Sequence, residues 1–211
     1  MKKTLVLFAC VLLICSVFVQ FQVVAEQINP DPECIALLEK RVELKKQKFK
    51  AFGAYVEAGT IPVAQYVDAQ IEVTEAKIDL YRYADNQKEL ITTLEKRVEL
   101  KKQKFTAFKA YMEAGIIPEA QYIDAQIETA NAEIDLYRYM GKQKELITTL
   151  EEKLNLSKKN YKSVEGYFDS GKITPEQLAD TQVTVIDAEL ELKLEKNLQA
   201  SEKLSKTNNE N

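Results

Sequence analysis

Apolar residues recur along this chain at steps of three and four, the spacing that places them on one face of an α-helix. The stripe before the first turn comprises Ile35, Leu38, Val42, Phe49, Phe52 and Val56, and the stripe after it Val67, Ile71, Thr74, Ile78 and Tyr81. The first stripe is widened toward the broad face of a bundle helix by Leu37, Leu44, Ala51 and Ala58. Glutamate and lysine fill most remaining positions, and no stretch alternates as a half-buried strand does. The pattern predicts an all-α protein.

The same pattern repeats with a period of 56 residues. Gly59, Gly115 and Gly171 are spaced at this interval, and residues 38–93 and 94–149 differ at only 13 of 56 positions. A more diverged copy follows at 150–205. Self-similarity at a fixed period indicates one supersecondary unit used several times. We therefore expect three repeats that form an elongated antiparallel coiled coil, or helical-hairpin bundle.

Each repeat carries helix-ending signals at its centre. A glycine suited to the left-handed C-terminal position is followed three or four residues later by a proline, which is favoured at a helix start. In the third copy Thr174 and Gln177 match a capping box around Pro175. Connections this short join antiparallel helices.

The junctions between repeats carry no proline. Residues 84–86 read Ala-Asp-Asn and residues 140–142 read Met-Gly-Lys. Since a periodic helix is seldom stopped by propensity alone, we expect continuous helices near 33–58, 62–114, 118–170 and 175–205. The two central helices would then be about 80 Å long. Breaks at the two triplets, giving three separate hairpins, are the alternative. The polar residues 206–211 are expected to form a disordered tail.

Residues 1–25 have the features of a signal peptide: two lysines, an apolar run over 5–19 and a Val-Val-Ala ending. An uncleaved anchor is less favoured because the run is shorter than the ~20 residues that span a bilayer. Cleavage after Ala25 would leave a short lead-in, 26–37, and an exported chain, periplasmic or secreted. Cys34 would then be the only cysteine, either an inert small side chain or an intermolecular crosslink.

Composition limits the chemistry. The chain has no histidine and no tryptophan, which removes histidine-based acid–base catalysis and argues against nitrogen- or sulfur-rich metal sites. The net charge is −4, with both signs interleaved, so no basic face for nucleic acid or for an anionic membrane surface is predicted. We expect a non-enzyme with no cofactor, which binds protein partners or associates with itself.

The turns are the best candidates for partner contact, because they place apolar residues on tight loops. The candidate residues are Gly59, Ile61, Pro62, Gly115, Ile116, Ile117, Pro118, Gly171, Ile173 and Pro175. The isoleucines would either plug the turn or face a partner. Three aspartates at a fixed distance after the glycines, Asp68, Asp124 and Asp180, are secondary candidates. They would either contact a partner or only complement a helix dipole.

The turn motif resembles one helical turn of the TolC-like outer-membrane efflux proteins. The matching residues are Tyr111, Gly115, Ile117, Asp124, Gln126, Ala132 and Leu136, with third-copy counterparts Tyr167, Gly171, Ile173, Asp180, Gln182, Ala188 and Leu192. The resemblance implies an exported helical coiled coil whose turns meet an adaptor protein in the periplasm. It covers the turns alone, and the strands of that family's barrel have no counterpart in this sequence.

The expected function is that of an exported structural or interaction protein that docks through its hairpin tips. An accessory component of an envelope efflux or transport assembly is one alternative. A helical bundle that carries a small ligand or lipid in a cavity is another.

The first testable prediction concerns export. Because the basic start, apolar run and small residues before Glu26 form a complete signal, residues 1–28 should direct a fused reporter out of the cytoplasm. N-terminal sequencing of the chain from its native host should begin at Glu26. A chain that retains Met1 would contradict the prediction.

Overall fold

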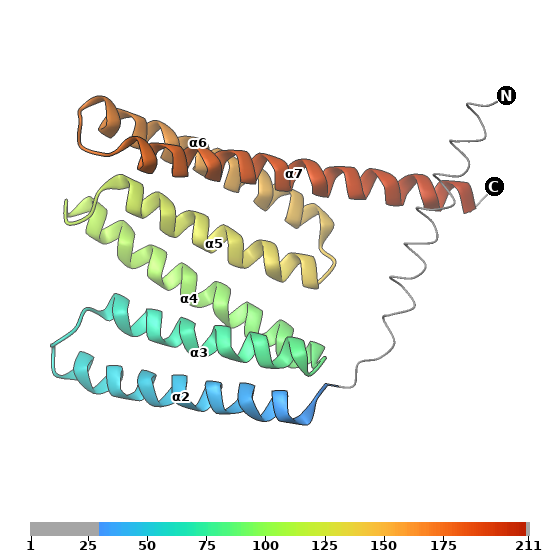
Figure 1. Ribbon diagram of the computed structural model, residues 1–211, viewed down its shortest axis with the longest axis horizontal. Helices are drawn as coiled ribbons and strands as arrows, with labels where there is room; N and C mark the ends of the chain where they lie inside the picture. The colour runs from blue at the N-terminus through green and yellow to red at the C-terminus, as the bar shows by residue number, and fades with distance from the viewer. Residues whose placement is uncertain (1–29, 210–211) are drawn as a thin grey trace.

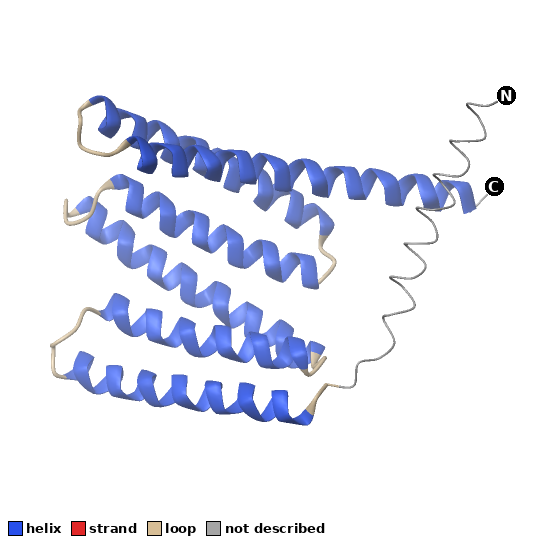
Figure 2. Cartoon of the chain, viewed as in Figure 1, coloured by secondary structure: helices blue, strands red, loops and turns tan. Residues whose placement is uncertain are grey.

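The computed structural model describes residues 30–209, and side chains up to residue 202. The predicted signal peptide, 1–25, the start of the lead-in, 26–29, and residues 210–211 lie outside this range. The described chain is helical with no strand, which confirms the all-α prediction (Figure 2). The helices are α2 (Pro32–Glu57), α3 (Val63–Tyr83), α4 (Gln87–Glu113), α5 (Glu119–Tyr139), α6 (Gln143–Asp169) and α7 (Pro175–Asn209).

The helices lie side by side in a row and alternate in direction (Figure 1). Among the described residues, each helix packs closely only against the helices before and after it in the chain. The pairs α2–α3, α4–α5 and α6–α7 are the three helical hairpins, and the α3–α4 and α5–α6 contacts join one hairpin to the next. This nearest-neighbour arrangement is typical of repeat proteins.

The prediction of continuous central helices is wrong. The chain reverses at 84–86 and at 140–142, where Asp85 has φ of 50° and Gly141 has φ of 64°. Aspartate and glycine are among the few residues that adopt this left-handed conformation at low cost. Asn86 then caps α4, since its side-chain oxygen accepts from the amide of Glu89 at 3.4 Å. The chain therefore forms three separate hairpins, and α7 continues to Asn209, past its predicted end at residue 205.

All five turns close with the same hydrogen bonds. At the first, the amide of Thr60 donates to the carbonyl of Tyr55 and the amide of Gly59 to that of Val56, both at 2.9 Å. This pair defines a Schellman motif. Its outer bond in every turn ends on the carbonyl of a tyrosine: Tyr55, Tyr81, Tyr111, Tyr137 and Tyr167. The left-handed glycines predicted at 59, 115 and 171 are confirmed, with φ of 66°, 71° and 70°.

The helix starts after the tips differ, as the sequence indicates. Thr174 and Gln177 form the predicted capping box, with bonds of 3.0 and 3.3 Å between each backbone amide and the other side chain. Pro62 and Pro118 occupy the N-cap position, where no side-chain cap bond forms.

The core lies between neighbouring helices. Val42, Val67, Ile71, Thr74 and Ile78 are buried as the apolar pattern predicts. The residues expected to widen the first stripe, Leu37, Leu44, Ala51 and Ala58, are exposed instead. Their side of α2 has no neighbour among the described residues, because α2 is the first described helix of the row.

Two glycine substitutions test the turn geometry. Gly115→Val should lower the free energy of unfolding by about 1–2 kcal/mol, because a branched side chain is strained at positive φ. Gly166→Ala lies inside α6, where an added Cβ meets nothing within 4 Å, and should raise stability by about 0.5–1 kcal/mol. Denaturant melts measure both. Equal effects of the two substitutions would contradict the assigned left-handed turn.

Candidate functional site

The three predicted contact turns lie at one edge of the row, at the α2–α3, α4–α5 and α6–α7 connections (Figure 1). Ile61, Ile117 and Ile173 are half-buried against the ends of their hairpins, while Pro62, Pro118 and Pro175 are exposed. Ile116 differs from all of these because it is 68% exposed. Ile116 is therefore the one large apolar side chain among the candidate turn residues that is mostly exposed.

The recurring aspartates join neighbouring hairpins. The Asp68 carboxylate of α3 pairs with Nζ of Lys104 on α4 at 3.1 Å. One repeat later, Asn160 on α6 donates to the Asp124 carboxylate of α5 at 2.7 Å. The equivalent Asp180 on α7 is exposed, and the described residues contain no later hairpin that could supply a partner. The spacing that the sequence shows is thus the spacing of inter-hairpin contacts.

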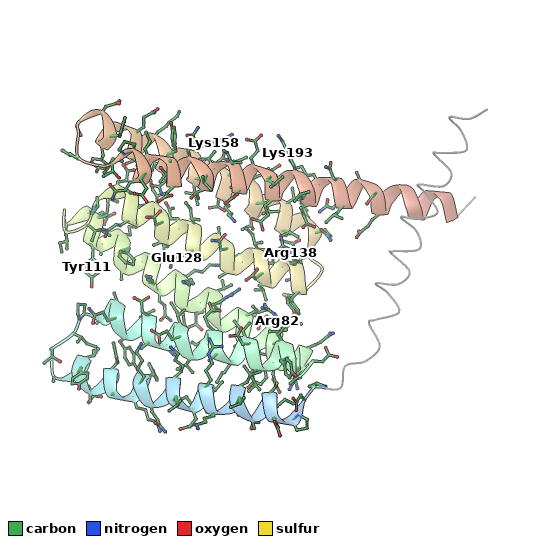
Figure 3. The ribbon with its side chains drawn as sticks, viewed as in Figure 1. Arg82, Tyr111, Glu128, Arg138, Lys158 and Lys193 are labelled. Carbon is green, nitrogen blue, oxygen red and sulfur yellow. The ribbon has the colours of Figure 1, made fainter. Side chains whose placement is uncertain are left out.

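A second set of ion pairs joins the two helices within each hairpin. Residues 38 positions apart pair at 2.7 Å in all three repeats: Arg41–Asp79, Arg97–Asp135 and Lys153–Glu191. Two repeats add a pair of lysines around one glutamate, which are Lys45 and Lys48 on Glu72, and Lys101 and Lys104 on Glu128. Glu128 lies near the middle of the row (Figure 3). Basic and acidic side chains therefore form ion pairs between neighbouring helices, in addition to alternating along each helix.

These contacts change how the carboxyl groups titrate. Hydrogen bonds from Lys45 and Lys48 lower the pKa of Glu72. Burial opposes ionisation of Glu128 and Glu191, but the cations around each outweigh it and lower the pKa. Desolvation raises the pKa of Asp124, and the bond from Asn160 only partly offsets the effect. The three lowered pKa values thus follow from ion pairs between helices, and the raised pKa of Asp124 follows from its burial.

Arg97 is the most buried charged residue of the described chain, at 7% exposure. Its guanidinium lies 3.4 Å from Glu75 on α3 and 2.7 Å from Asp135 on α5. It therefore bridges the helices on both sides of α4. Its buried Nε atom has no hydrogen-bond acceptor in the structure.

Sequence reasoning missed the two ends of the row. The outer face of α7 carries five apolar side chains that are each more than half exposed, which we call the α7 stripe: Val183, Ile186, Leu190, Leu194 and Leu198. The outer face of α2 exposes Leu37 at 67% and Leu44 at 56%. Alignment of the repeats could have found the stripe, because Val183 and Leu190 are equivalent to the buried Ile127 and Ile134.

Metal sites, membrane spans and cavities each bear on the function of the described residues. These residues contain no group of three or more acidic, histidine or cysteine side chains placed to hold a metal. None of their helices combines the length and apolar character needed to cross a membrane. A hollow of about 580 Å³ beside Leu38, Arg41 and Tyr83 is open to solvent.

The fold is that of an α-helical hairpin repeat, and the candidate contact surfaces are the tips and the end helices. No family model, no curated protein and no solved structure matches this chain. The likeness of its turns to the TolC-like family stays a prediction from the sequence.

The lowered carboxyl pKa values predict acid sensitivity. Glu72, Glu128 and Glu191 bind protons more weakly in the folded chain than in the unfolded one, where their pKa is near 4.5. Their contribution is complete above that value and is lost as the pH falls through the lower folded pKa. The raised pKa of Asp124 acts in the opposite direction. Glu189, which pairs with Lys193 on the surface of α7, also has a lowered pKa. With four lowered groups against one, the melting temperature should fall between about pH 5 and pH 3.

The matched variants are Glu128→Gln and Glu57→Gln. The first should flatten the pH dependence of melting, whereas the second changes an exposed glutamate for which the described residues provide no ion pair and should leave it unchanged. Melting that is constant or rises on acidification would rule out a stabilising role of the ion pairs.

Proposed function

We propose that this chain is an exported, non-enzymatic helical-repeat protein that acts by contact with other proteins through its hairpin tips. The observation that carries the proposal is Ile116, which is 68% exposed at the tip of the middle hairpin. The equivalent positions in the other repeats are Thr60 and Lys172, so the turn itself does not require an apolar residue there. An exposed apolar side chain that the fold does not need favours a binding role.

The backbone of the tips supports the same proposal. The amides of Gly115 and Ile116 are held by Schellman bonds of 2.9 and 2.8 Å, and Pro118 fixes the start of the next helix. A loop held in this way loses little conformational freedom on binding, which favours affinity. Because three such tips lie along one edge, a partner could contact more than one of them (Figure 1).

The ionisable groups support contact rather than catalysis. Four carboxylates that lie between helices have shifted pKa values. Three of them, Glu72, Glu128 and Glu191, accept hydrogen bonds from lysines. The fourth, Asp124, accepts a bond from Asn160. Within this proposal, the resemblance of the turns suggests an envelope protein as the partner, of the adaptor kind that meets helical tips in TolC-like systems.

Affinity capture from an envelope extract tests the proposal. Ile116→Ser should weaken binding of the captured protein about fivefold or more, as loss of a central apolar contact does, and should leave melting unchanged because the side chain is exposed. Tyr139→Ser is the matched control, since Tyr139 is 42% exposed but ends α5 at the edge of the row opposite the tips. Capture that is equal for both variants and the unchanged chain would contradict docking through the tips.

A further inference from the structure

The outer faces of the two end helices, α2 and α7, are more apolar than the ends of repeat proteins usually are. Terminal repeats normally present a polar outer face to water. In this chain the α7 stripe has exposures between 52% and 58%, and α2 exposes Leu37 and Leu44 on its own outer face. Both ends of the row therefore present apolar surface that has no neighbour within the described chain.

Three of the five stripe positions, Val183, Ile186 and Leu190, are buried in the repeats that another hairpin follows, whereas Leu194 and Leu198 replace polar residues. Val183 is equivalent to Ile71 and Ile127, which are 7% and 8% exposed, and Leu190 is equivalent to Ile78 and Ile134, at 1% and 2%. On the other side, Leu44 is equivalent to Leu100, which is 1% exposed and packs against Val67 and Ile71 of α3. The α3–α4 contact thus buries the counterparts of Val183, Ile186 and Leu190 on one helix and of Leu44 on the other.

The charged residues match in the same register. Two ion pairs hold α3 to α4, Asp68–Lys104 at 3.1 Å and Glu75–Arg97 at 3.4 Å. The residues equivalent to the two acids are Asp180 and Asp187 on α7, and those equivalent to the two bases are Lys48 and Arg41 on α2. Each position retains the sign of its charge. The two end faces are therefore complementary in charge as well as in apolar surface.

Arg41 on α2 has hydrogen-bond donors that no acid of its own hairpin uses. Arg97 binds Asp135 within its own hairpin and reaches Glu75 on the preceding one. Its counterpart Arg41 binds Asp79 within its hairpin, at 2.7 Å, and is otherwise exposed. Guanidinium carries five donors, so a second carboxylate can be accommodated.

From this continuity we infer that the α7 stripe is covered by the α2 outer face of a second copy of this chain. The two copies would stack head to tail and repeat the α3–α4 contact between molecules, with Asp187 of one copy against Arg41 of the next. Such a contact joins two different faces, so it leaves one free face at each end and can extend into longer assemblies. It would also align the tips of successive copies along one edge. The inference goes beyond the proposed tip contact and rests on different residues.

Two edge-blocking variants of the chain test the inference by sedimentation. Leu190→Glu places a charge on the α7 stripe and Leu44→Glu places one on the α2 outer face, both at exposed positions where folding is preserved. The unchanged chain should form species that grow with concentration. Each variant alone should be monomeric, and an equimolar mixture should form a dimer and nothing larger, because only one pair of unblocked faces remains. Ile116→Glu, at the tip, should assemble as the unchanged chain does.

Other outcomes overturn the inference. An unchanged chain that stays monomeric at its highest soluble concentration would mean that something else covers the stripe. A Leu44→Glu variant that still dimerises, beside a monomeric Leu190→Glu variant, would indicate a symmetric α7–α7 contact. The register has its own test, since Asp187→Arg would place two cations together and should weaken assembly about tenfold. Assembly that Asp187→Arg leaves unchanged would exclude the assigned register. Capture of a partner tests the tips, and sedimentation tests the outer faces of α2 and α7, so either proposal can fail while the other holds.

Discussion

Among the described residues, each helix packs only against its neighbours in the chain, apart from side-chain contacts such as the 3.1 Å ion pair between Arg138 of α5 and Glu191 of α7. Because of that constraint, the helices form a row and not a bundle with a shared core. The free energy of unfolding is then the sum of the stabilities of the hairpins and of the contacts between neighbouring hairpins. It also means that the first and last helices must each lack one neighbour. The exposed faces of α2 and α7 are therefore a direct consequence of the architecture, and only their apolar character needs a separate explanation.

The contacts between helices are specified by charge as well as by apolar surface. Arg97 is buried and joins α3, α4 and α5 through Glu75 and Asp135. A buried charge is costly unless it is paired, so any shift in the register of these helices would leave it uncompensated. The third hairpin departs from the scheme, because Ser157 and Asn160 replace the two lysines of the earlier repeats and Thr184 replaces the glutamate. Asn160 still binds Asp124 of the preceding hairpin. The third hairpin therefore keeps this contact between hairpins and its Lys153–Glu191 pair, and loses only the cluster of two lysines around a glutamate.

Much of the fold was predictable from the sequence because the signals are local. The period, the left-handed glycines and the capping box at Thr174 each depend on a few adjacent residues. The breaks at 84–86 and 140–142 were missed because they use no proline. Asp85 in a left-handed conformation followed by the cap at Asn86 ends one helix and starts the next as effectively.

The candidate sites were harder to predict, because exposure depends on position in the row. Leu44 and Leu100 occupy the same place in their repeats, yet one is 56% exposed and the other 1%. Amphipathic spacing identifies the side of a helix that can be buried, but it does not tell which helices lie at the ends. The aspartates show the same limit: Asp68 and Asp180 share a motif, and only Asp68 has a following hairpin with which to pair.

The distance between the first two tips tests the central claim most directly, because it depends on the breaks that separate the hairpins. Spin labels at residues 60 and 116, in a chain with Cys34→Ser and diluted with unlabelled protein, report this distance by pulsed electron resonance. Neighbouring hairpins in one row place the two tips about two helix spacings, ~20 Å, apart at the same edge. Continuous central helices would instead place them ~80 Å apart at opposite ends of a rod, and a distance in that range would contradict a row of three hairpins.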